Sequence, residues 1–192
     1  MIQINRWAIA AGLLLITTTL APRVRALQGD SGSGDPGSKA PGPSASANPR
    51  STGAAIMTGD EWRFLELLNR ERAARHLAEL KPDPLLVSVA REHSREMCDK
   101  SYFDHVSPTP GIRTPMDRYL HAVRHRPAHA CVGENLFYCS IVDIERGHRA
   151  LMNSPGHRAN ILYAPFRRSG IGIYKSDTGE FWVTQMFLTT EG

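Results

Sequence analysis

Apolar residues recur at helical spacing in the segment that begins near residue 57. The first run follows Thr58-Gly59-Asp60-Glu61, a capping-box pattern, and its predicted buried stripe is Trp62, Leu65, Leu68 and Ala73. Asp83 and Pro84 are of the residue types preferred at the N-cap and the first position of a helix. The buried stripe of this second helix is predicted to be Leu86, Val89 or Ala90, His93 and Met97.

Two further helices and three strands are predicted beyond residue 113. Thr114-Pro115 opens a third helix, and a fourth helix begins at an N-cap within 140–143. Apolar runs favour strands over 131–137, 169–174 and 181–188, with a hairpin loop at 175–179 between the last two. Because helices come first and an antiparallel hairpin comes last, the order predicts an α+β fold rather than alternating βαβ units.

The position of the charges changes what the basic composition means. The 192 residues include 23 Lys+Arg and 19 Asp+Glu, a net charge of +4 that would suit nucleic acid or an anionic membrane. Three of the basic residues, Arg6, Arg23 and Arg25, fall within the first 26 residues. Without them the balance is 20 against 19, so neither a basic partner-binding surface nor a nucleic-acid partner is predicted.

Residues 1–26 resemble a secretory signal peptide. Arg6 supplies a positive start, and Val24-Arg25-Ala26 has the small-x-small outline of a cleavage site. The uncharged segment between them has 16 residues, fewer than the roughly 20 that span a bilayer. We therefore expect cleavage near Ala26, a secreted (extracellular or periplasmic) chain, and no transmembrane segment in the mature protein. Residues 27–56, rich in Gly, Ser and Pro, are expected to be a disordered linker before a domain at 57–192.

Export would place the three cysteines in an oxidising environment, where disulfides persist. If 131–139 is a single strand, Cys131 and Cys139 lie roughly 26 Å apart by strand rise, which is too far for a bond. A disulfide would therefore join Cys98 to either Cys131 or Cys139, and the two alternatives stay open.

Two of the eight histidines stand among turn-forming residues. His105 enters a predicted loop, and His157 follows a Pro-Gly turn, while Glu134 comes directly after Gly133 between them. Loop positions of this kind commonly present side chains to ligands. His93, on the apolar face of the second helix, is instead expected to be a core imidazole bonded to backbone, and His148 is expected at the surface.

Six short sequence motifs, which follow one another in a fixed order along the chain, carry a resemblance to a known family. The central three are Phe103-Asp104-His105, Gly133-Glu134-Asn135-Leu136 and Ser154-Pro155-Gly156-His157-Arg158, and the others occupy 68–72, 170–173 and 182–187. Together they resemble a bacterial SCP or CAP domain, of the superfamily of cysteine-rich secretory proteins, antigens and pathogenesis-related proteins. The resemblance covers about residues 60–188. It implies a three-layer α-β-α sandwich with a central antiparallel sheet and a surface cleft.

The resemblance also implies which residues line the cleft. Two histidines and acidic residues line it in the family, and they correspond here to His105, Glu134 and His157, with Asn135 and Ser154 beside them. Ser154 stands where many members carry a second glutamate. Two imidazoles and a carboxylate form an open three-ligand set for a divalent cation such as Zn²⁺ or Ca²⁺. A metal-free hydrogen-bonded cluster is the alternative explanation.

Three functions remain as hypotheses. The favoured one is a secreted binding module for a lipid, a sterol or a cell-envelope ligand, because no convincing nucleophile is found. The alternative is a divalent-metal-dependent, peptidase-like hydrolase with His105 and His157 as ligands and Glu134 as third ligand or general base. A third hypothesis is a structural envelope protein held through its linker. The oligomeric state is not predicted.

Overall fold

The secondary structure follows the predicted order of helices first and a hairpin last. The computed structural model describes residues 57–191, so the predictions for 1–26 and 27–56 concern residues outside the described range. The elements are α1 (Gly59–Ala73), β1 (Lys81–Pro82), α2 (Pro84–Asp99), α3 (Pro115–Ala122), β2 (His129–Cys139), α4 (Ile144–Asn153), α5 (Pro155–Ile161), β3 (Arg168–Lys175) and β4 (Phe181–Glu191). Within residues 57–191, no helix is both long and apolar enough to cross a membrane.

The predicted helix starts are confirmed by their capping interactions. Thr58 forms the expected capping box at the start of α1, and Thr114 forms a second one at the start of α3. The Asp83 side chain accepts hydrogen bonds from the first-turn N–H groups of α2, and Asp143 does the same for α4. Each cap satisfies backbone N–H groups that have no partner inside the helix, which is why these starts can be predicted locally.

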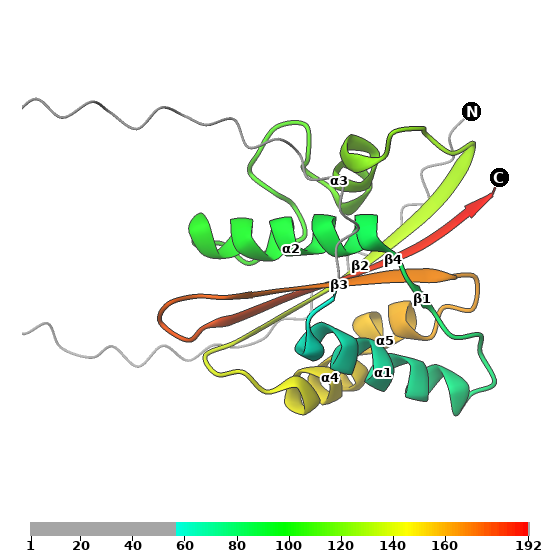
Figure 1. Ribbon diagram of the computed structural model, residues 1–192, viewed down its shortest axis with the longest axis horizontal. Coiled ribbons are helices and arrows are strands. Elements are labelled where there is room, and N and C mark those ends of the chain that lie inside the picture. The colour runs from blue at the N-terminus through cyan, green and yellow to red at the C-terminus, as the bar shows by residue number, and fades with distance from the viewer. Residues whose placement is uncertain (1–56, 192) are drawn as a thin grey trace, which may run out of the picture. The chain divides into compact units, whose positions relative to one another are not determined.

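Within residues 57–191, four strands form one sheet in the order β1-β3-β4-β2. The β3–β4 hairpin and the β4–β2 pair are antiparallel, whereas the two-residue β1 joins β3 in parallel. Figure 1 shows α2 and α3 on one face of the sheet and α1, α4 and α5 on the other. The predicted α+β class and three-layer α-β-α arrangement are therefore confirmed. Among the strands of residues 57–191, β2 lies at the edge, so one side of its backbone has no neighbouring strand in this sheet.

The helix α2 packs directly on the backbone of β3. A Cβ atom added to Gly172 would lie 2.1 Å from the backbone N of Arg91, and one added to Gly170 would lie 2.2 Å from the backbone C of Leu86. These two glycines of β3 therefore let helix and strand approach more closely than any side chain would allow. The close approach fixes the height of α2 above the sheet, and with it the side chains that α2 contributes to the site.

Three of the predicted burial assignments were wrong. Trp62 and Ala73, expected in the buried stripe of α1, are both exposed, Trp62 by 48%. The buried face of α1 is formed instead by Glu61, Phe64, Leu65, Leu68 and Arg72. Glu61 occupies that face because it accepts hydrogen bonds from Arg91 and from the backbone N–H of Ile173. His148, expected at the surface, is 6% exposed because its side of α4 is a buried one.

Replacing Gly172 with Ala is expected to destabilise the fold strongly. The new Cβ would meet helix backbone at 2.1 Å, so α2 must shift, at a cost of about 3 kcal/mol. Gly59→Ala is the control, because an added Cβ there meets nothing within 4 Å. Urea denaturation measures both. A Gly172→Ala variant as stable as the wild type would contradict the close packing of α2 on β3.

Candidate functional site

A buried carboxylate lies at the centre of the candidate site. Glu134 belongs to the edge strand β2, and its side chain is only 1% exposed. Its Oε1 accepts a hydrogen bond from His105 Nδ1 at 2.8 Å, and its Oε2 accepts one from Arg118 Nη2 at 2.5 Å. Burial raises the pKa of Glu134, but the bond from His105 and the charge of Arg118 outweigh it, so the pKa is lowered. The carboxylate is therefore ionised and held in one orientation.

Arg118 is the counter-ion of Glu134, and it was not among the predicted site residues. It comes from α3 and is 4% exposed. Besides Glu134, its guanidinium donates to the backbone carbonyl of His105 at 3.2 Å and to those of Ile112 and Arg113. The same cation thus binds the sheet edge and the loop between α2 and α3, which is the loop that carries His105.

A second carboxylate, Glu96 of α2, holds the near end of this loop. Its oxygens accept hydrogen bonds from four side chains, those of Lys100, Tyr102, Ser107 and Thr109. Burial opposes ionisation, but these donors outweigh it and lower the pKa of Glu96 to about 2. Three of the four donors lie between residues 101 and 110, so the charge on Glu96 fixes the path of the loop on either side of His105.

His93 confirms its predicted role as a core imidazole and adds a contact with the site. It is 1% exposed, and its Nε2 lies 3.2 Å from the backbone carbonyl of Asp104. Its Nδ1 lies 3.4 Å from the Tyr102 hydroxyl. The Nε2 atom is also 3.9 Å from Glu134 Oε1. Burial lowers the pKa of His93, so the ring is neutral at neutral pH. An uncharged imidazole therefore lies next to the Glu134 carboxylate.

The opposite face of the same strand positions His157. Successive residues of a strand point to opposite faces, so Asn135 faces away from Glu134, toward α5. Its Nδ2 donates to the backbone carbonyl of His157 and to Gln185 Oε1, each at 3.1 Å. Asn160 Nδ2 of α5 donates at 3.0 Å both to Asn135 Oδ1 and to the backbone carbonyl of Glu134. Hydrogen bonds therefore hold this part of β2 on both faces of the sheet, through the Glu134 side chain on one face and through Asn135 and Asn160 on the other.

His105 and His157 approach each other around this edge. The side chain of His105 is 46% exposed, whereas His157 is half-buried at the start of α5. Burial lowers the pKa of His157, and the proximity of His105 lowers it further, so His157 is neutral at neutral pH. The structure thus brings together His105, Glu134, Asn135 and His157. Ser154 is the N-cap residue of α5, and within residues 57–191 its side chain makes no hydrogen bond to them.

The predicted three-ligand metal set is not assembled. Within residues 57–191, no three His, Cys, Asp or Glu side chains are arranged to hold a metal ion. The physical reason lies in Glu134, because His105 occupies one of its oxygens and the Arg118 cation occupies the other. A divalent cation at this carboxylate would have to displace a buried guanidinium, and the donor set as arranged does not fit a resident metal.

The predicted disulfide is absent as well. Cys98, Cys131 and Cys139 are all free thiols. Cys98, a residue of α2, packs beside Leu136 and Trp182 on the α2 face of the sheet, whereas Cys131 packs against the core on the α1 and α4 face. The unbroken register of β2 places Cys139 on the same face as Cys131. The sheet therefore lies between Cys98 and both of its predicted partners.

Comparisons with known proteins agree with this fold. The family model for CAP, the cysteine-rich secretory protein family, matches residues 65–187. The uncharacterized protein YkwD of Bacillus subtilis is 34% identical over 172 residues, which cover 90% of this chain and 63% of YkwD. The uncharacterized membrane protein YlbC of the same organism is 31% identical, over 69% of this chain and 35% of YlbC. The chain therefore spans less than two thirds of either relative.

Two solved structures are similar to the described fold. The crystal structure of an extracellular protein containing an SCP domain, from Bacillus anthracis, matches with a TM-score of 0.60 at 30% identity. That match covers 69% of this chain and 41% of the other. An outer surface protein from Borrelia burgdorferi matches with a TM-score of 0.59 at 19% identity, over 71% of this chain and 97% of that protein. The second match is a likeness of fold alone.

Removing the charge of Glu96 is expected to lower the free energy of unfolding and to make that free energy less dependent on pH in acid. Because the pKa falls from 4.5 to about 2 in the folded protein, this contribution is complete above pH 4.5 and is lost as the pH falls toward 2. Glu96→Gln should lower the free energy of unfolding at pH 7 by about 1–3 kcal/mol and flatten its slope below pH 4.5.

Urea denaturation between pH 2 and pH 7 measures this effect, with Glu79→Gln, an exposed site, as the control. An unchanged slope in the Glu96→Gln variant would show that the four donors do not stabilise the ionised carboxylate.

Proposed function

Because the chain belongs to the cysteine-rich secretory protein (CAP) family, we propose that it is an exported binding module whose ligand contacts the cleft at His105 and His157. Export is supported by the signal-peptide pattern at residues 1–26 and by the B. anthracis relative, which is described as extracellular. Nothing in this proposal requires a metal ion at the cleft.

The observation that carries the proposal is the burial and hydrogen bonding of Glu134. Each carboxylate oxygen accepts a hydrogen bond, one from His105 and one from Arg118, and the side chain is 1% exposed, so Glu134 has no accessible oxygen for a ligand. Its role is to orient the imidazole of His105, as a buried carboxylate commonly does. With Nδ1 donating to Glu134, the neutral ring leaves Nε2 as a hydrogen-bond acceptor on an exposed side chain.

The surroundings of His105 suggest the class of ligand. Phe103 and Val106, in the same loop, are 50% and 43% exposed. Exposed large apolar side chains beside a polar group are typical of sites that bind amphipathic molecules. An acceptor flanked by apolar surface suits a lipid or sterol, whose hydroxyl would donate to His105 Nε2 while its hydrocarbon body covers Phe103.

One further observation favours a second candidate, hydrolysis. A carboxylate hydrogen-bonded to Nδ1 of a histidine is also the arrangement that prepares Nε2 to take a proton from water. In that case His105, rather than Glu134 as the sequence suggested, would act as the general base. The geometry offers this base without a metal ion, so the peptidase-like alternative becomes a histidine-dependent one.

Binding of a fluorescent sterol with a free hydroxyl is expected to depend on His105. His105→Ala should weaken binding about tenfold, because it removes one hydrogen bond at a partly buried site. His125→Ala is the matched control, since His125 is an exposed histidine in the loop after α3. The same sterol with its hydroxyl methylated should bind the wild type as weakly as the free sterol binds His105→Ala.

Equal affinities of the wild type and His105→Ala would place lipid binding outside the cleft and overturn the proposal. Turnover of ester or peptide substrates that His105→Ala abolishes, together with no sterol binding, would replace it with the hydrolytic function.

A further inference from the structure

Large apolar side chains are exposed at one end of the sheet. Within residues 57–191, four of the seven exposed large apolar side chains lie there: Phe103 (50% exposed), Tyr138 (39%), Ile141 (56%) and Val142 (44%). Figure 1 shows the C-terminal end of α2, the end of β2 and the β3–β4 hairpin loop at this same end, which agrees with the strand register. We call these four residues the end patch.

The members of the end patch are close neighbours. The ring centroid of Phe103 lies 6.2 Å from that of Tyr138 and 6.0 Å from that of Trp182. Trp182, only 7% exposed, also contacts Tyr138 at 4.3 Å between centroids, so it supports both rings from within. Ile141 follows Tyr138 by three residues, a stretch that spans at most about 11 Å. The four side chains therefore belong to one surface rather than being scattered.

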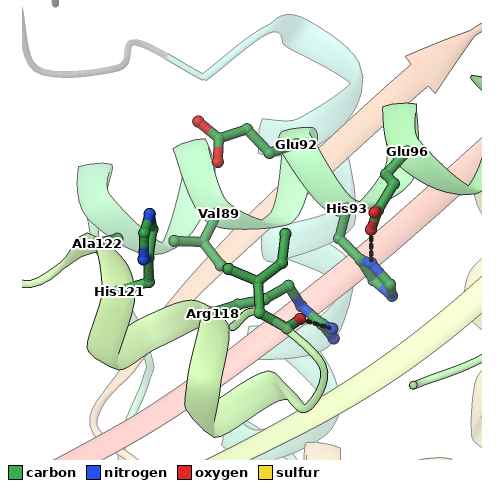
Figure 2. A pocket seen from close by; sticks show the side chains of 8 residues that line it. Val89, Glu92, His93, Glu96, Arg118, His121 and Ala122 are labelled. Carbon is green, nitrogen blue, oxygen red and sulfur yellow. Dashed lines mark hydrogen bonds and ion pairs between the residues drawn. The ribbon is translucent and has the colours of Figure 1, made fainter. Parts of the chain in front are cut away.

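The exposed position of Phe103 is fixed by its two neighbours in the loop. The Tyr102 hydroxyl donates to Glu96 Oε2 at 2.7 Å, and His93 Nε2 lies 3.2 Å from the backbone carbonyl of Asp104. Figure 2 shows Glu96 and His93 extending from α2 toward each other, with 3.7 Å between Glu96 Oε2 and His93 Nδ1. Because both neighbours of Phe103 are anchored to α2, the patch is already formed in the absence of a partner.

The charges around the end patch are mainly negative. The three segments that form this end, 98–104, 138–143 and 175–181, contain five acidic and two basic residues. The basic ones, Lys100 and Lys175, each form an ion pair with a carboxylate outside these segments. Four of the five acidic residues have no basic partner in the described part of the chain. An anionic partner would therefore be repelled, whereas a partner without net charge would not.

We propose that the end patch docks the protein on a lipid bilayer whose surface is zwitterionic. Ile141 and Val142, consecutive in the loop before α4, enter the acyl-chain region. Phe103 and Tyr138 lie at the level of the headgroups, where aromatic side chains are favoured. A fluid bilayer needs no matching shape, so it can accept side chains from separate segments. Its polar interface also accommodates the Tyr138 hydroxyl, which donates to Glu180.

The proposal deepens the binding function proposed above, and it rests on that function for the choice of a lipid surface as the partner. Phe103 belongs to the end patch and also lies two residues before His105 in the same loop. Docking through the patch brings the cleft next to the membrane that contains its ligand. A lipid could then pass from the bilayer to His105 without its hydrocarbon body crossing water.

Vesicle flotation tests the proposal. Protein collected after export and signal-peptide cleavage is mixed with phosphatidylcholine vesicles, so that the apolar stretch within residues 1–26 does not itself bind lipid. The wild type should float with the vesicles. A variant that combines Ile141→Ser and Val142→Ser should partition at least about tenfold more weakly, because two aliphatic side chains no longer enter the bilayer. Admixed phosphatidylglycerol should weaken wild-type binding, and salt should reverse that weakening.

The matched control is Tyr163→Ser, which removes a side chain of similar exposure, 44%, at the opposite end of the sheet, where the chain enters β3. It should leave partition unchanged, and thermal denaturation confirms that each variant is folded. Three results would each overturn the proposal: no wild-type binding to phosphatidylcholine vesicles, equal partition of the Ile141/Val142 variant and the wild type, or tighter binding to the anionic vesicles.

The sterol titration, carried out without vesicles, keeps this proposal separate from the one on which it rests. The Ile141/Val142 variant should bind the fluorescent sterol as tightly as the wild type, because His105 and Phe103 are unchanged. Failure of docking and failure of sterol binding at His105 are therefore observed independently.

Discussion

The ion pair between Arg118 and Glu134 is the interaction on which the rest of the site depends. Both side chains are almost completely removed from water, so neither charge could remain there without the other. The remaining N–H groups of Arg118 hold the loop that carries His105, and the second oxygen of Glu134 holds the His105 ring. One buried pair thus connects the sheet, α3 and the more exposed of the two cleft imidazoles.

The position of Glu134 on an edge strand explains why two layers of helices can meet at one site. The outer side of β2 has no neighbouring strand within the described sheet, so Asn160 of α5 can bond the backbone carbonyl of Glu134. Alternation along the strand then sends Glu134 toward α2 and α3 and Asn135 toward α5. His105 and His157 arrive from opposite faces for this reason, although 52 positions separate them in the sequence.

The features that could be predicted from the sequence are those governed by local interactions or by the family phrases. The caps at Thr58, Asp83 and Thr114 act within three residues, so their residue types suffice to place the helix starts. The resemblance supplied His105, Glu134 and His157. It could not supply Arg118, because an arginine in an amphipathic helix usually faces solvent, and only the folded loop shows that this one is buried.

The errors have a common physical cause, which is that residue type does not reveal which partner a group has. Two histidines and a glutamate suggested a metal set, yet the oxygens of Glu134 are already bonded to His105 and Arg118. Trp62 suggested a buried face, yet Glu61 takes that face through Arg91. The cysteines suggested a bridge, yet the sheet separates Cys98 from its predicted partners. In each case a long-range contact decides the outcome.

The most direct test of this account is a double-mutant cycle on the buried pair, measured by urea denaturation at pH 7. Glu134→Gln and Arg118→Met should each lower the free energy of unfolding by about 3–5 kcal/mol, because each leaves one buried charge without its counter-ion. The double variant should lose at least about 2 kcal/mol less than the sum of the single variants. Strictly additive losses would show that the two charges do not depend on each other, and would contradict the central role given to the pair.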